Sequence, residues 1–572
     1  MRTGDNMLLN GAKILLECLL EQGVDTVFGY PGGTILNVYD ELYSYGDRIR
    51  HILTAHEQGA CHAADGYARS TGKVGVCFST SGPGATNLVT GIATAYLDSS
   101  PIVCITCNVS LPLIGKDSFQ EVDITGVTMP ITKCNYLVRD VQHLADTVRE
   151  AFAIARSGRP GPVVIDIVKN VTAEETEFEP LDRREHGVSG RLGELMRRYD
   201  FKPPEPDMDD IRKLADMIRA AQRPMLICGG GVVRARADKQ FTDFAHKIDA
   251  PVAITVMGAG GFRGEDELTT GMIGMHGSQA SNMAVDECDL LIAIGCRFSD
   301  RVALKPATFA QHAQVVQIDI DRAEINKNVE TAHHIIGDAR RVLELLTPMV
   351  PQLSHPEWKK QVFSRPTETE YDERPGCLTP GQVLSAISRL APPESIVSTD
   401  VGQHQMWAIQ HFHFDYPGQL LTSGGFGTMG FSLGAAIGAQ VGHPEKRVIH
   451  LTGDGGFRMN CNELATEQYY KLPIITVVFN NGTLGMVRQW QNLIYHQHYS
   501  QTTLDRAPDF VLLAQAYGLN GYRAENVQEF EQVFKEALES GRGCVIDAKI
   551  DIDEMVRPMV GGGEHITNFM ID

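Results

Sequence analysis

The sequence contains no hydrophobic run long enough to cross a membrane. Its longest apolar stretches, residues 289–295 and 472–479, have the length of single strands, whereas a membrane-spanning helix needs about 18 apolar residues or more. The N-terminus lacks the basic and then apolar segment of an export signal, because residues 10–22 follow the period of an amphipathic helix. We therefore expect a soluble, cytoplasmic protein with no membrane as its partner.

A block of basic residues is also missing. The chain has 51 Lys and Arg residues against 71 Asp and Glu, which gives a net charge of −20. An acidic chain without a basic cluster is poorly suited to bind nucleic acid or an anionic lipid surface. The charge balance therefore excludes nucleic acid from the expected partners.

Cysteine is too sparse for a disulfide framework. The 572 residues include 12 cysteines, most of them in apolar segments, which is typical of reduced core thiols. Cys104 and Cys107 form a C-x-x-C pair, but no second pair is present to complete a zinc site. We expect both to be core thiols with no redox role.

A β-branched run, a glycine-rich turn and a helical period follow one another repeatedly along the chain. Residues 74–80, for example, lead into the turn 81–87 (SGPGATN). This alternation predicts α/β domains with parallel sheets and crossover helices. Charged segments that contain proline and lack periodicity separate three such blocks. The predicted domains are residues 1–173, 209–347 and 379–572, with linkers at 174–208 and 348–378.

The third block carries the strongest chemical signal. An apolar strand at 447–451 is followed by Gly453-Asp454-Gly455, and the next strand is followed by Asn481, with a helical stretch at 461–470 between them. Because the carboxyl ends of parallel strands meet at one sheet edge, Asp454 and Asn481 are expected to converge. A carboxylate and an amide oxygen suit Mg²⁺ that also binds phosphate oxygens. A strand-end turn with an Asx motif is the alternative.

This segment resembles the thiamine diphosphate motif of thiamine-dependent decarboxylases and carboligases. The resemblance implies that Mg²⁺ is bound by the side chains of Asp454 and Asn481 and by the backbone carbonyl of Thr483. It also implies that Met429 is an apolar wedge between the two rings of the cofactor. The other implied contacts to thiamine diphosphate are Gly32, Val401, Gly402, Gln403, His404, Gly427, Gly453, Gly455, Gly456, Gly485 and Met486.

Glu57 stands in the first block, within His56-Glu57-Gln58-Gly59-Ala60 and after the strand-like residues 49–54. A single Glu in this position is also typical of a helix N-terminus. Together with SGPGATN, however, the segment resembles the first domain of acetolactate synthases. Glu57 then corresponds to the carboxylate that is bonded to the aminopyrimidine of the cofactor.

The resemblance covers nearly the whole chain and is nearest to the large catalytic subunit of biosynthetic acetolactate synthases. It implies three doubly wound parallel-sheet domains, of which the middle one is Rossmann-like and binds FAD. Phe119, Gln120, Arg301 and Trp490 match the family's substrate site, with Arg301 suited to a carboxylate. The implied flavin contacts are Gly229, Gly230, Met275, His276, Arg297, Asp319 and Asp338.

The family implies a reaction and a set of partners. Pyruvate is decarboxylated on thiamine diphosphate, and the two-carbon unit is transferred to a second 2-oxoacid, which gives 2-acetolactate or 2-aceto-2-hydroxybutyrate for branched-chain amino acid synthesis. Because Glu57 and Asp454 lie in different domains, and the family takes them from different subunits, a dimer with active sites at its interface is implied. A small regulatory subunit of the ACT type is implied as a second partner.

Several positions depart from the family pattern and leave alternatives open. Cys107 replaces a usual glycine, Ser299 an acidic residue, and Arg557 and Gly561 an apolar residue and a proline. These changes put substrate preference in doubt. A flavin-linked pyruvate oxidase, a related thiamine carboligase with another acceptor, and a non-catalytic thiamine-binding protein are the alternatives.

Overall fold

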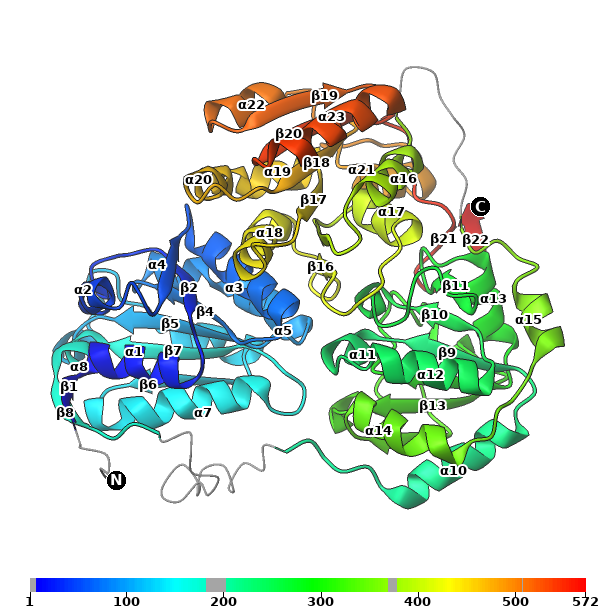
Figure 1. Ribbon diagram of the computed structural model, residues 1–572, viewed down its shortest axis with the longest axis horizontal. Coiled ribbons are helices and arrows are strands. Elements are labelled where there is room, and N and C mark those ends of the chain that lie inside the picture. Colours follow the sequence, from blue (N-terminus) through cyan, green and yellow to red (C-terminus); the bar gives the residue numbers. More distant parts are fainter. Residues whose placement is uncertain (1–6, 182–201, 369–377, 507, 572) are drawn as a thin grey trace.

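The computed structural model describes residues 7–181, 202–368, 378–506 and 508–571. These residues form three lobes that meet at the centre of the molecule (Figure 1), each built on a six-stranded parallel sheet. The α/β fold class predicted from the sequence is thereby confirmed. Most of the first predicted linker (182–201) and the end of the second (369–377) lie outside the described residues.

The first lobe, blue to cyan in Figure 1, has the strand order β3-β2-β4-β5-β7-β6. An antiparallel pair, β1 (Met7–Asn10) and β8 (Glu175–Phe178), stands beside it. The sheet strands are β2 (Thr26–Gly29), β3 (Arg50–Leu53), β4 (Gly75–Ser79), β5 (Ile102–Asn108), β6 (Cys134–Val138) and β7 (Val163–Val168). The helices are α1 (Gly11–Glu21), α2 (Leu36–Ser44), α3 (Glu57–Thr71), α4 (Pro83–Asn87), α5 (Val89–Leu97), α6 (Ile124–Thr128), α7 (Leu144–Arg156) and α8 (Lys169–Ala173).

The middle lobe, green in Figure 1, has the strand order β11-β10-β9-β12-β13-β14. The strands are β9 (Pro224–Cys228), β10 (Val252–Ile254), β11 (Thr269–Met272), β12 (Leu290–Ile294), β13 (Gln314–Asp319) and β14 (His333–Ile336). The helices are α10 (Met208–Ala220), α11 (Gly230–Arg234), α12 (Asp238–Ile248), α13 (Gln279–Glu287), α14 (Ala339–Leu346) and α15 (Pro356–Val362). Helix α15 falls in the segment predicted as the second linker, where Trp358 and Val362 are buried in the core of this lobe.

The third lobe, yellow to red, has the strand order β16-β15-β17-β18-β20-β19. The strands are β15 (Ile396–Thr399), β16 (Leu420–Thr422), β17 (Val448–Gly453), β18 (Ile475–Asn480), β19 (Asn520–Ala524) and β20 (Cys544–Lys549). The helices are α16 (Pro380–Leu390), α17 (Gln403–His411), α18 (Phe431–Gly442), α19 (Asp454–Asn460), α20 (Leu464–Tyr469), α21 (Gly485–Leu493), α22 (Phe510–Ala516) and α23 (Val527–Ser540).

Helices α3 and α18 join the first and third lobes (Figure 1) by close packing of small residues. A Cβ atom on Gly438 would stand 1.9 Å from the backbone oxygen of Ala63, and one on Gly66 would stand 2.2 Å from that of Ala435. The two backbones can therefore approach this closely only because glycine occupies both positions.

The C-terminal residues return to the middle lobe. The short strands β21 (Met559–Val560) and β22 (Phe569–Ile571) pair antiparallel, and the amide of Val560 donates to the carbonyl of Met275 (2.8 Å). The tail is thus held against the middle lobe by backbone hydrogen bonds.

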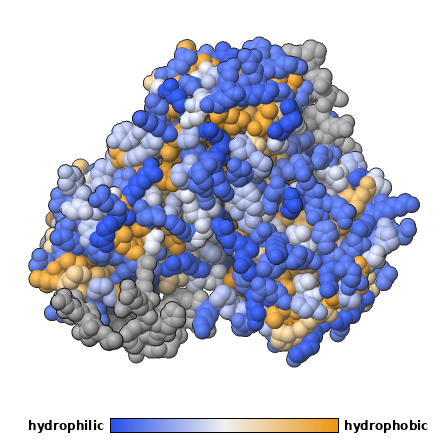
Figure 2. Space-filling view, in the orientation of Figure 1, coloured by the Kyte–Doolittle hydropathy of each residue, from blue (hydrophilic) through white to orange (hydrophobic). Residues whose placement is uncertain are grey.

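Hydrophilic residues predominate on the face shown in Figure 2, and hydrophobic ones form separate patches. In the part of the chain that the structure describes, no helix combines the length and apolar character that a membrane crossing requires.

Candidate functional site

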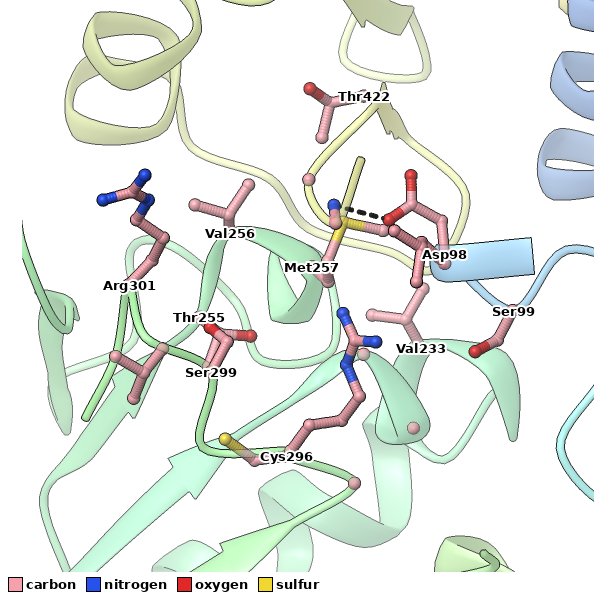
Figure 3. A pocket seen from close by; sticks show the side chains of 18 of the residues that line it. Asp98, Ser99, Val233, Thr255, Val256, Met257, Cys296, Ser299, Arg301 and Thr422 are labelled. Carbon is pink, nitrogen blue, oxygen red and sulfur yellow. Dashed lines mark hydrogen bonds between the residues drawn. The ribbon is translucent and has the colours of Figure 1, made fainter. Parts of the chain in front are cut away.

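A cavity of about 1100 Å³ lies where the three lobes meet, and all three contribute to its wall. Figure 3 shows Asp98 and Ser99 of the first lobe, Val233 to Arg301 of the middle lobe and Thr422 of the third around it. The sequence-predicted residues that line this cavity are Gly230, Met275, His276, Arg297, Arg301, Asp319, Asp338, Val401, Gly402, Gly427, Met429, Met486 and Trp490.

In the part of the wall that the middle lobe forms, the start of a helix packs against the end of a strand, and glycines make this contact possible. A Cβ atom on Gly229 would stand 2.2 Å from the Gly295 oxygen, and one on Gly231 would stand 2.5 Å from the Gly295 Cα atom. Helix α11 therefore begins directly against the end of β12, where the Gly231 amide donates to the carbonyl of Gly295 (3.0 Å), and Gly230 and Gly231 line the cavity. Asp319 ends β13, and burial raises the pKa of its carboxyl to about 6.

The third-lobe wall includes a loop at 423–430 that is fixed by Asp400. The buried Asp400 carboxylate accepts hydrogen bonds from the amides of Val401 (2.8 Å) and Gly430 (2.9 Å) and from the Ser432 hydroxyl (2.7 Å). Gly427 and Gly430 have φ angles of +69° and +86°, which other residues adopt only with strain. The loop is therefore pre-shaped, with Met429 facing the cavity.

The predicted metal ligands meet at the carboxyl ends of β17 and β18, which pair in parallel. Asp454 is 1% exposed, and the Gly455 amide donates to its Oδ1 (2.9 Å). Its Oδ2 atom is buried and has no hydrogen-bond partner among the residues that the structure describes. Burial raises the pKa of Asp454 to about 6, and the backbone N–H of Gly482, next to Asn481, also interacts with this carboxylate. A buried carboxylate oxygen that receives no hydrogen bond is costly unless it binds a cation. Asp454 is therefore suited to be a metal ligand.

Asn481 and Thr483 are held in the same turn. The Asn481 Oδ1 atom accepts from the Thr483 amide (3.3 Å), and its amide nitrogen donates to Gln403 (3.2 Å). The Thr483 hydroxyl donates to the carbonyl of Thr502 (2.8 Å). Gln403 in turn donates to Gln489 (3.0 Å), so that helix α17 is tied to helix α21 behind the turn.

Two further glycines leave room for His404. Cβ atoms on Gly402 or Gly453 would stand 3.1 Å from its ring, which stacks on Phe479 with centroids 6.3 Å apart. Burial lowers the pKa of His404 to about 3, and within the described parts of the chain its buried Nε2 atom has no hydrogen-bond partner. His404 is thus a neutral imidazole between β15 and β17, with one nitrogen left for a ligand.

Three more glycines that were predicted to contact the cofactor lie in the first turns of α19 and α21. A Cβ atom on Gly455 would stand 2.5 Å from Leu484, one on Gly456 2.7 Å from Asp400, and one on Gly485 2.0 Å from Gln403. Each is a close approach that a side chain would block. Helix α19 begins at Asp454 itself, whereas the sequence predicted a turn here and a helix only at 461–470. Extended Gly453 is the N-cap residue of α19, so the backbone N–H groups of its first turn begin at Asp454 and are suited to an anion such as a phosphate.

Glu57 is the first residue of α3 and is 9% exposed. Its Oε2 atom accepts from the Asn87 side chain (3.0 Å), and a Cβ atom on Gly84 would stand 3.1 Å from its Oε1. The motif SGPGATN therefore supplies both a donor and the open space beside this carboxylate. Glu57 does not line the large cavity.

Glu463 of the third lobe holds the chain that leads into α3. Its carboxylate accepts from the amides of Ala55 (3.1 Å) and His56 (3.0 Å), and a Cβ atom on Gly59 would stand 2.0 Å from its Oε1. The sequence analysis missed this residue, because 408 positions separate it from Ala55 and no local pattern links them.

Three further predicted residues of the first lobe, like Glu57, lie outside the cavity wall. Phe119 is 88% exposed, and the neighbouring Gln120 has a φ angle of +60°. Gly32 packs against Thr80, to which its Cβ would come within 2.5 Å. The structure of the single chain therefore does not bring Phe119 and Gln120 together with Arg301 and Trp490.

Arg301 and Trp490 do lie at one end of the cavity. Arg301 reaches the sulfur of Met275 (3.7 Å), and Trp490 packs with Met275, Leu304, Val560 and Phe569. The Arg301 side chain is 64% exposed, and its ion pair with Asp300 is long, at 3.9 Å. An accessible guanidinium beside an apolar wall is suited to a small carboxylate with an apolar tail.

A buried ion-pair group at the cavity was not predicted. Arg69 binds Asp65 (2.7 Å) and Asp98 (3.2 Å) and donates to the carbonyl of Thr422 (2.7 Å). The Asp98 carboxylate accepts from the amide of Gly425 (2.7 Å), the dashed line in Figure 3. This group joins the first lobe to the loop at 423–430. Asp65 and Arg69 are one helical turn apart, but Gly425 is 327 positions from Asp98, so no local pattern signals the contact between the lobes.

Comparison with known proteins gives the class of this fold and site. Models of the thiamine pyrophosphate enzyme N-terminal TPP binding domain, central domain and C-terminal TPP binding domain match residues 9–127, 211–346 and 400–548. One model matches each lobe, in the order of the three sheets. The three lobes and the group around Asp454 thus define a thiamine pyrophosphate enzyme.

Curated relatives narrow the class. The chain is 43% identical to the acetolactate synthase isozyme 2 large subunit of Escherichia coli, over 97% of this chain and 98% of that protein. It is 44% identical to the acetolactate synthase large subunit of Parasynechococcus marenigrum (97% and 90%) and 40% identical to that of Haemophilus influenzae (97% and 97%). The chain belongs to the family of acetolactate synthase large subunits, as its motifs indicated.

Proposed function

We propose that this protein is a thiamine diphosphate-dependent carboligase that decarboxylates pyruvate and transfers the two-carbon unit to a second 2-oxoacid, forming 2-acetolactate. The observation that carries the proposal is the group at the ends of β17 and β18, where Asp454 keeps a buried, unpartnered oxygen beside Asn481. Full-length similarity to acetolactate synthase large subunits gives the reaction.

The donor set suits Mg²⁺ bound to a diphosphate. Asp454, Asn481 and the Thr483 carbonyl would supply three oxygen ligands, and the diphosphate and water would complete the shell. The start of α19 adds backbone N–H groups next to Gly455 and Gly456. Val401, Gly402, Gln403, His404, Gly427, Gly485, Met486 and Gly32 are the further proposed contacts, with Met429 against the cofactor's rings.

When bound, thiamine diphosphate supplies a carbon nucleophile and an electron sink for the loss of CO₂. Glu57 holds and exchanges a proton with the aminopyrimidine side of the cofactor, and Asn87 orients its carboxylate through the 3.0 Å hydrogen bond. Glu463 fixes the backbone at Ala55 and His56, which keeps the first turn of α3 in place.

The acceptor 2-oxoacid is proposed to bind between Arg301 and Trp490. Arg301 pairs with its carboxylate, while Trp490 and Met275 pack against its alkyl chain. Phe119 and Gln120 are proposed to reach this site from a second copy of the chain, since the single chain leaves Phe119 exposed.

The remainder of the cavity fits a dinucleotide, and we propose FAD. Gly229 and Gly230 at the start of α11 suit its diphosphate, and Asp319 and Asp338 are placed at the ends of β13 and α14 for its hydroxyl groups. Met275, His276 and Arg297 complete the proposed set. No net oxidation occurs in the proposed reaction, so the flavin has a structural role.

Further proposals concern the oligomeric state of the protein, its partner and its location in the cell. We propose a homodimer whose active sites lie between subunits, a small regulatory subunit as partner, and the cytoplasm as location. Its relatives in Escherichia coli and Parasynechococcus marenigrum are named large subunits, which supports a small partner.

The test is a product assay of the purified chain with pyruvate, thiamine diphosphate, Mg²⁺ and FAD that follows CO₂, acetolactate and dissolved oxygen together. The expected result is one acetolactate per CO₂ without oxygen uptake. CO₂ release with oxygen consumption and no acetolactate would instead establish a flavin-linked oxidase. A parallel reaction with added 2-oxobutyrate reports the acceptor preference.

A further inference from the structure

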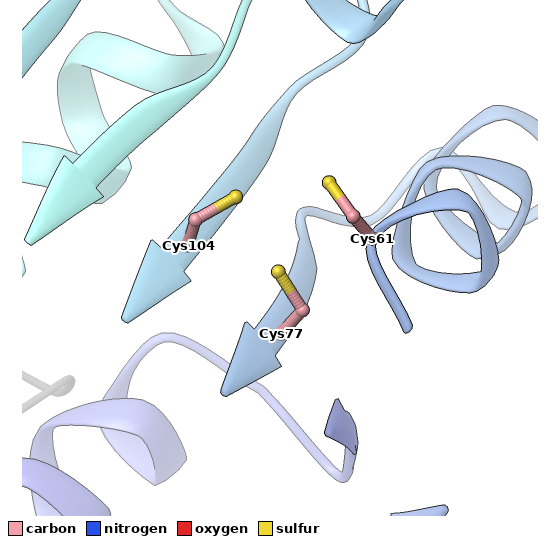
Figure 4. Close-up of side chains that lie close together, drawn as sticks. All are labelled: Cys61, Cys77 and Cys104. Atoms are coloured by element: carbon pink, nitrogen blue, oxygen red, sulfur yellow. The ribbon is translucent and has the colours of Figure 1, made fainter. Parts of the chain in front are cut away.

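Three cysteines far apart in the sequence meet in the core of the first lobe. Cys61 lies on α3, Cys77 on β4 and Cys104 on β5, and their sulfur atoms all lie within 4.8 Å of one another. Figure 4 shows the three sulfur atoms close together, between the helix that carries Cys61 and the strands that carry Cys77 and Cys104. Each residue is 0% exposed.

The geometry of the sheet explains why the three sulfur atoms lie close together. Cys77 and Cys104 are direct partners in the register of β4 and β5, so their side chains leave the same face of the sheet. Helix α3 covers that face and brings Cys61 above them. Cys107 is three positions beyond Cys104 and points to the opposite face, where it joins a different core. Cys104 and Cys107 therefore lie on opposite faces of the sheet. Cys104 lies beside Cys61 and Cys77 and not beside Cys107.

The surroundings of the sulfurs are apolar. Their neighbours in the core cluster include Leu88, Ile92 and Ile102, and the Cys61 sulfur would stand 2.5 Å from a Cβ atom on Gly91. The side-chain interactions of the Cys77 sulfur come from the other two thiols. Asp65 lies one turn after Cys61, but Arg69 already neutralises it (2.7 Å).

We propose that Cys61, Cys77 and Cys104 form a three-sulfur binding site for a trivalent thiophilic metalloid, arsenic(III). Because no two of the sulfurs are more than 4.8 Å apart, a point exists that lies within 4.8/√3, about 2.8 Å, of all three. From that upper limit, a planar centre with bonds of about 2.3 Å, the length of a zinc–thiolate bond, needs each sulfur to move inward by roughly 0.5 Å. Trivalent arsenic keeps a lone pair and lies above the plane of its three ligands, so it needs a somewhat larger inward shift.

The net charge of the bound complex favours a trivalent element over a monovalent or divalent metal ion. Arsenous acid is neutral, and its three hydroxyl groups leave as three water molecules when three S–H protons are taken up and three As–S bonds form, with no change of oxidation state. The product is neutral. Three thiolates on Cu⁺ or Zn²⁺ would leave a net charge of −2 or −1, which is costly in an apolar core without a counter-ion. A small neutral solute can also enter a closed core more readily than a hydrated cation.

The test is a titration of the full-length chain, loaded with its cofactors and fully reduced, with arsenite. Cys134, Cys377 and Cys461 are first replaced by serine, because Cys134 and Cys461 are partly exposed and Cys377 lies outside the described residues. Bound arsenic is counted after gel filtration, and X-ray absorption gives the number of sulfur neighbours. We expect one arsenic per chain with three sulfur neighbours.

Single Cys→Ala variants at positions 61, 77 and 104 are each expected to weaken binding at least 100-fold. Cys107→Ala is the matched control, because it removes a buried thiol from the same strand and is expected to bind like the parent. Circular dichroism and the thermal midpoint of each variant show that its fold is kept, and each of the three positions gives an independent test. Equal binding by the three variants and the parent, fewer than three sulfur neighbours, or stronger three-sulfur binding of Zn²⁺ or Cu⁺ than of arsenite would overturn the proposal.

Discussion

Glu57 allows a substitution that separates chemistry from structure. Its carboxylate accepts a hydrogen bond from the Asn87 side chain (3.0 Å), and a glutamine at the same position can still accept it. Glu57→Gln is therefore expected to leave the thermal midpoint nearly unchanged. Acetolactate formation should fall by about 100-fold or more, the usual contribution of a general acid–base group. Steady-state kinetics with saturating thiamine diphosphate measure the effect; undiminished turnover would remove Glu57 from the proposed chemistry.

Asp166 of β7 should make stability depend on pH. Its carboxyl is 2% exposed and accepts from Thr106 (2.6 Å) and Asn108 (2.6 Å), and burial raises its pKa from 3.8 to about 6. Between these values the folded state holds a proton that the unfolded state has lost, so its relative stability falls as the pH rises through the window. Above pH 6 both states are ionised, and the full cost of about 3 kcal/mol remains.

Asp166→Asn keeps two hydrogen bonds but cannot ionise, since its oxygen can accept from Asn108 while its nitrogen donates to the Thr106 hydroxyl. The cost in the parent grows by roughly 1.5 kcal/mol between pH 5 and pH 8. Urea unfolding at these two pH values is expected to show the variant gaining that much on the parent at the higher pH. An equal difference at both values would show that this carboxyl titrates normally in the folded chain.

Secondary-structure elements were predictable wherever a local pattern decides them. The strands at 74–80 and 447–451 were placed to within two residues, because each is an apolar run buried in a parallel sheet. Helix α19 was missed, because Gly455 and Gly456 read locally as a turn. Its packing beneath the strand ends overrides that weak propensity, and the same packing places Asp454 at a helix N-terminus.

Helices α3 and α18 provide a test of lobe coupling. In Gly438→Ala the new Cβ would meet the Ala63 backbone oxygen at 1.9 Å, which no side-chain rotation can relieve. The gain of roughly 1 kcal/mol in helix propensity should be outweighed by an overpacking cost of about 1–3 kcal/mol or more. A lower thermal midpoint is expected. The control is Gly46→Ala, where the nearest atom would be 3.9 Å away; an equal or smaller loss at Gly438 would contradict the close packing.

On the scale of the whole molecule, the sequence gives the parts of the site but not their assembly. Asp454 and Asn481 could be paired from the sequence, because one crossover unit contains both. The contact of Glu463 with the backbone of His56, and that of Asp98 with Gly425, join lobes that no local pattern relates. Side-chain packing between lobes decides such contacts, and a single sequence carries no record of it.

Whether one chain can be active alone also depends on the arrangement of the whole molecule. Glu57 lies outside the large cavity, and Phe119 is 88% exposed, which is expected if a second copy completes each site. Glu57→Gln and Asp454→Asn chains, each inactive alone, are co-expressed with different tags and purified through both. In a two-fold dimer with shared sites, one of the two sites is then made of unaltered residues only, so about half of the wild-type activity should return. If both groups of a site came from the same chain, the mixed dimer would remain inactive, whereas each variant chain expressed by itself is inactive under either arrangement and serves as the control.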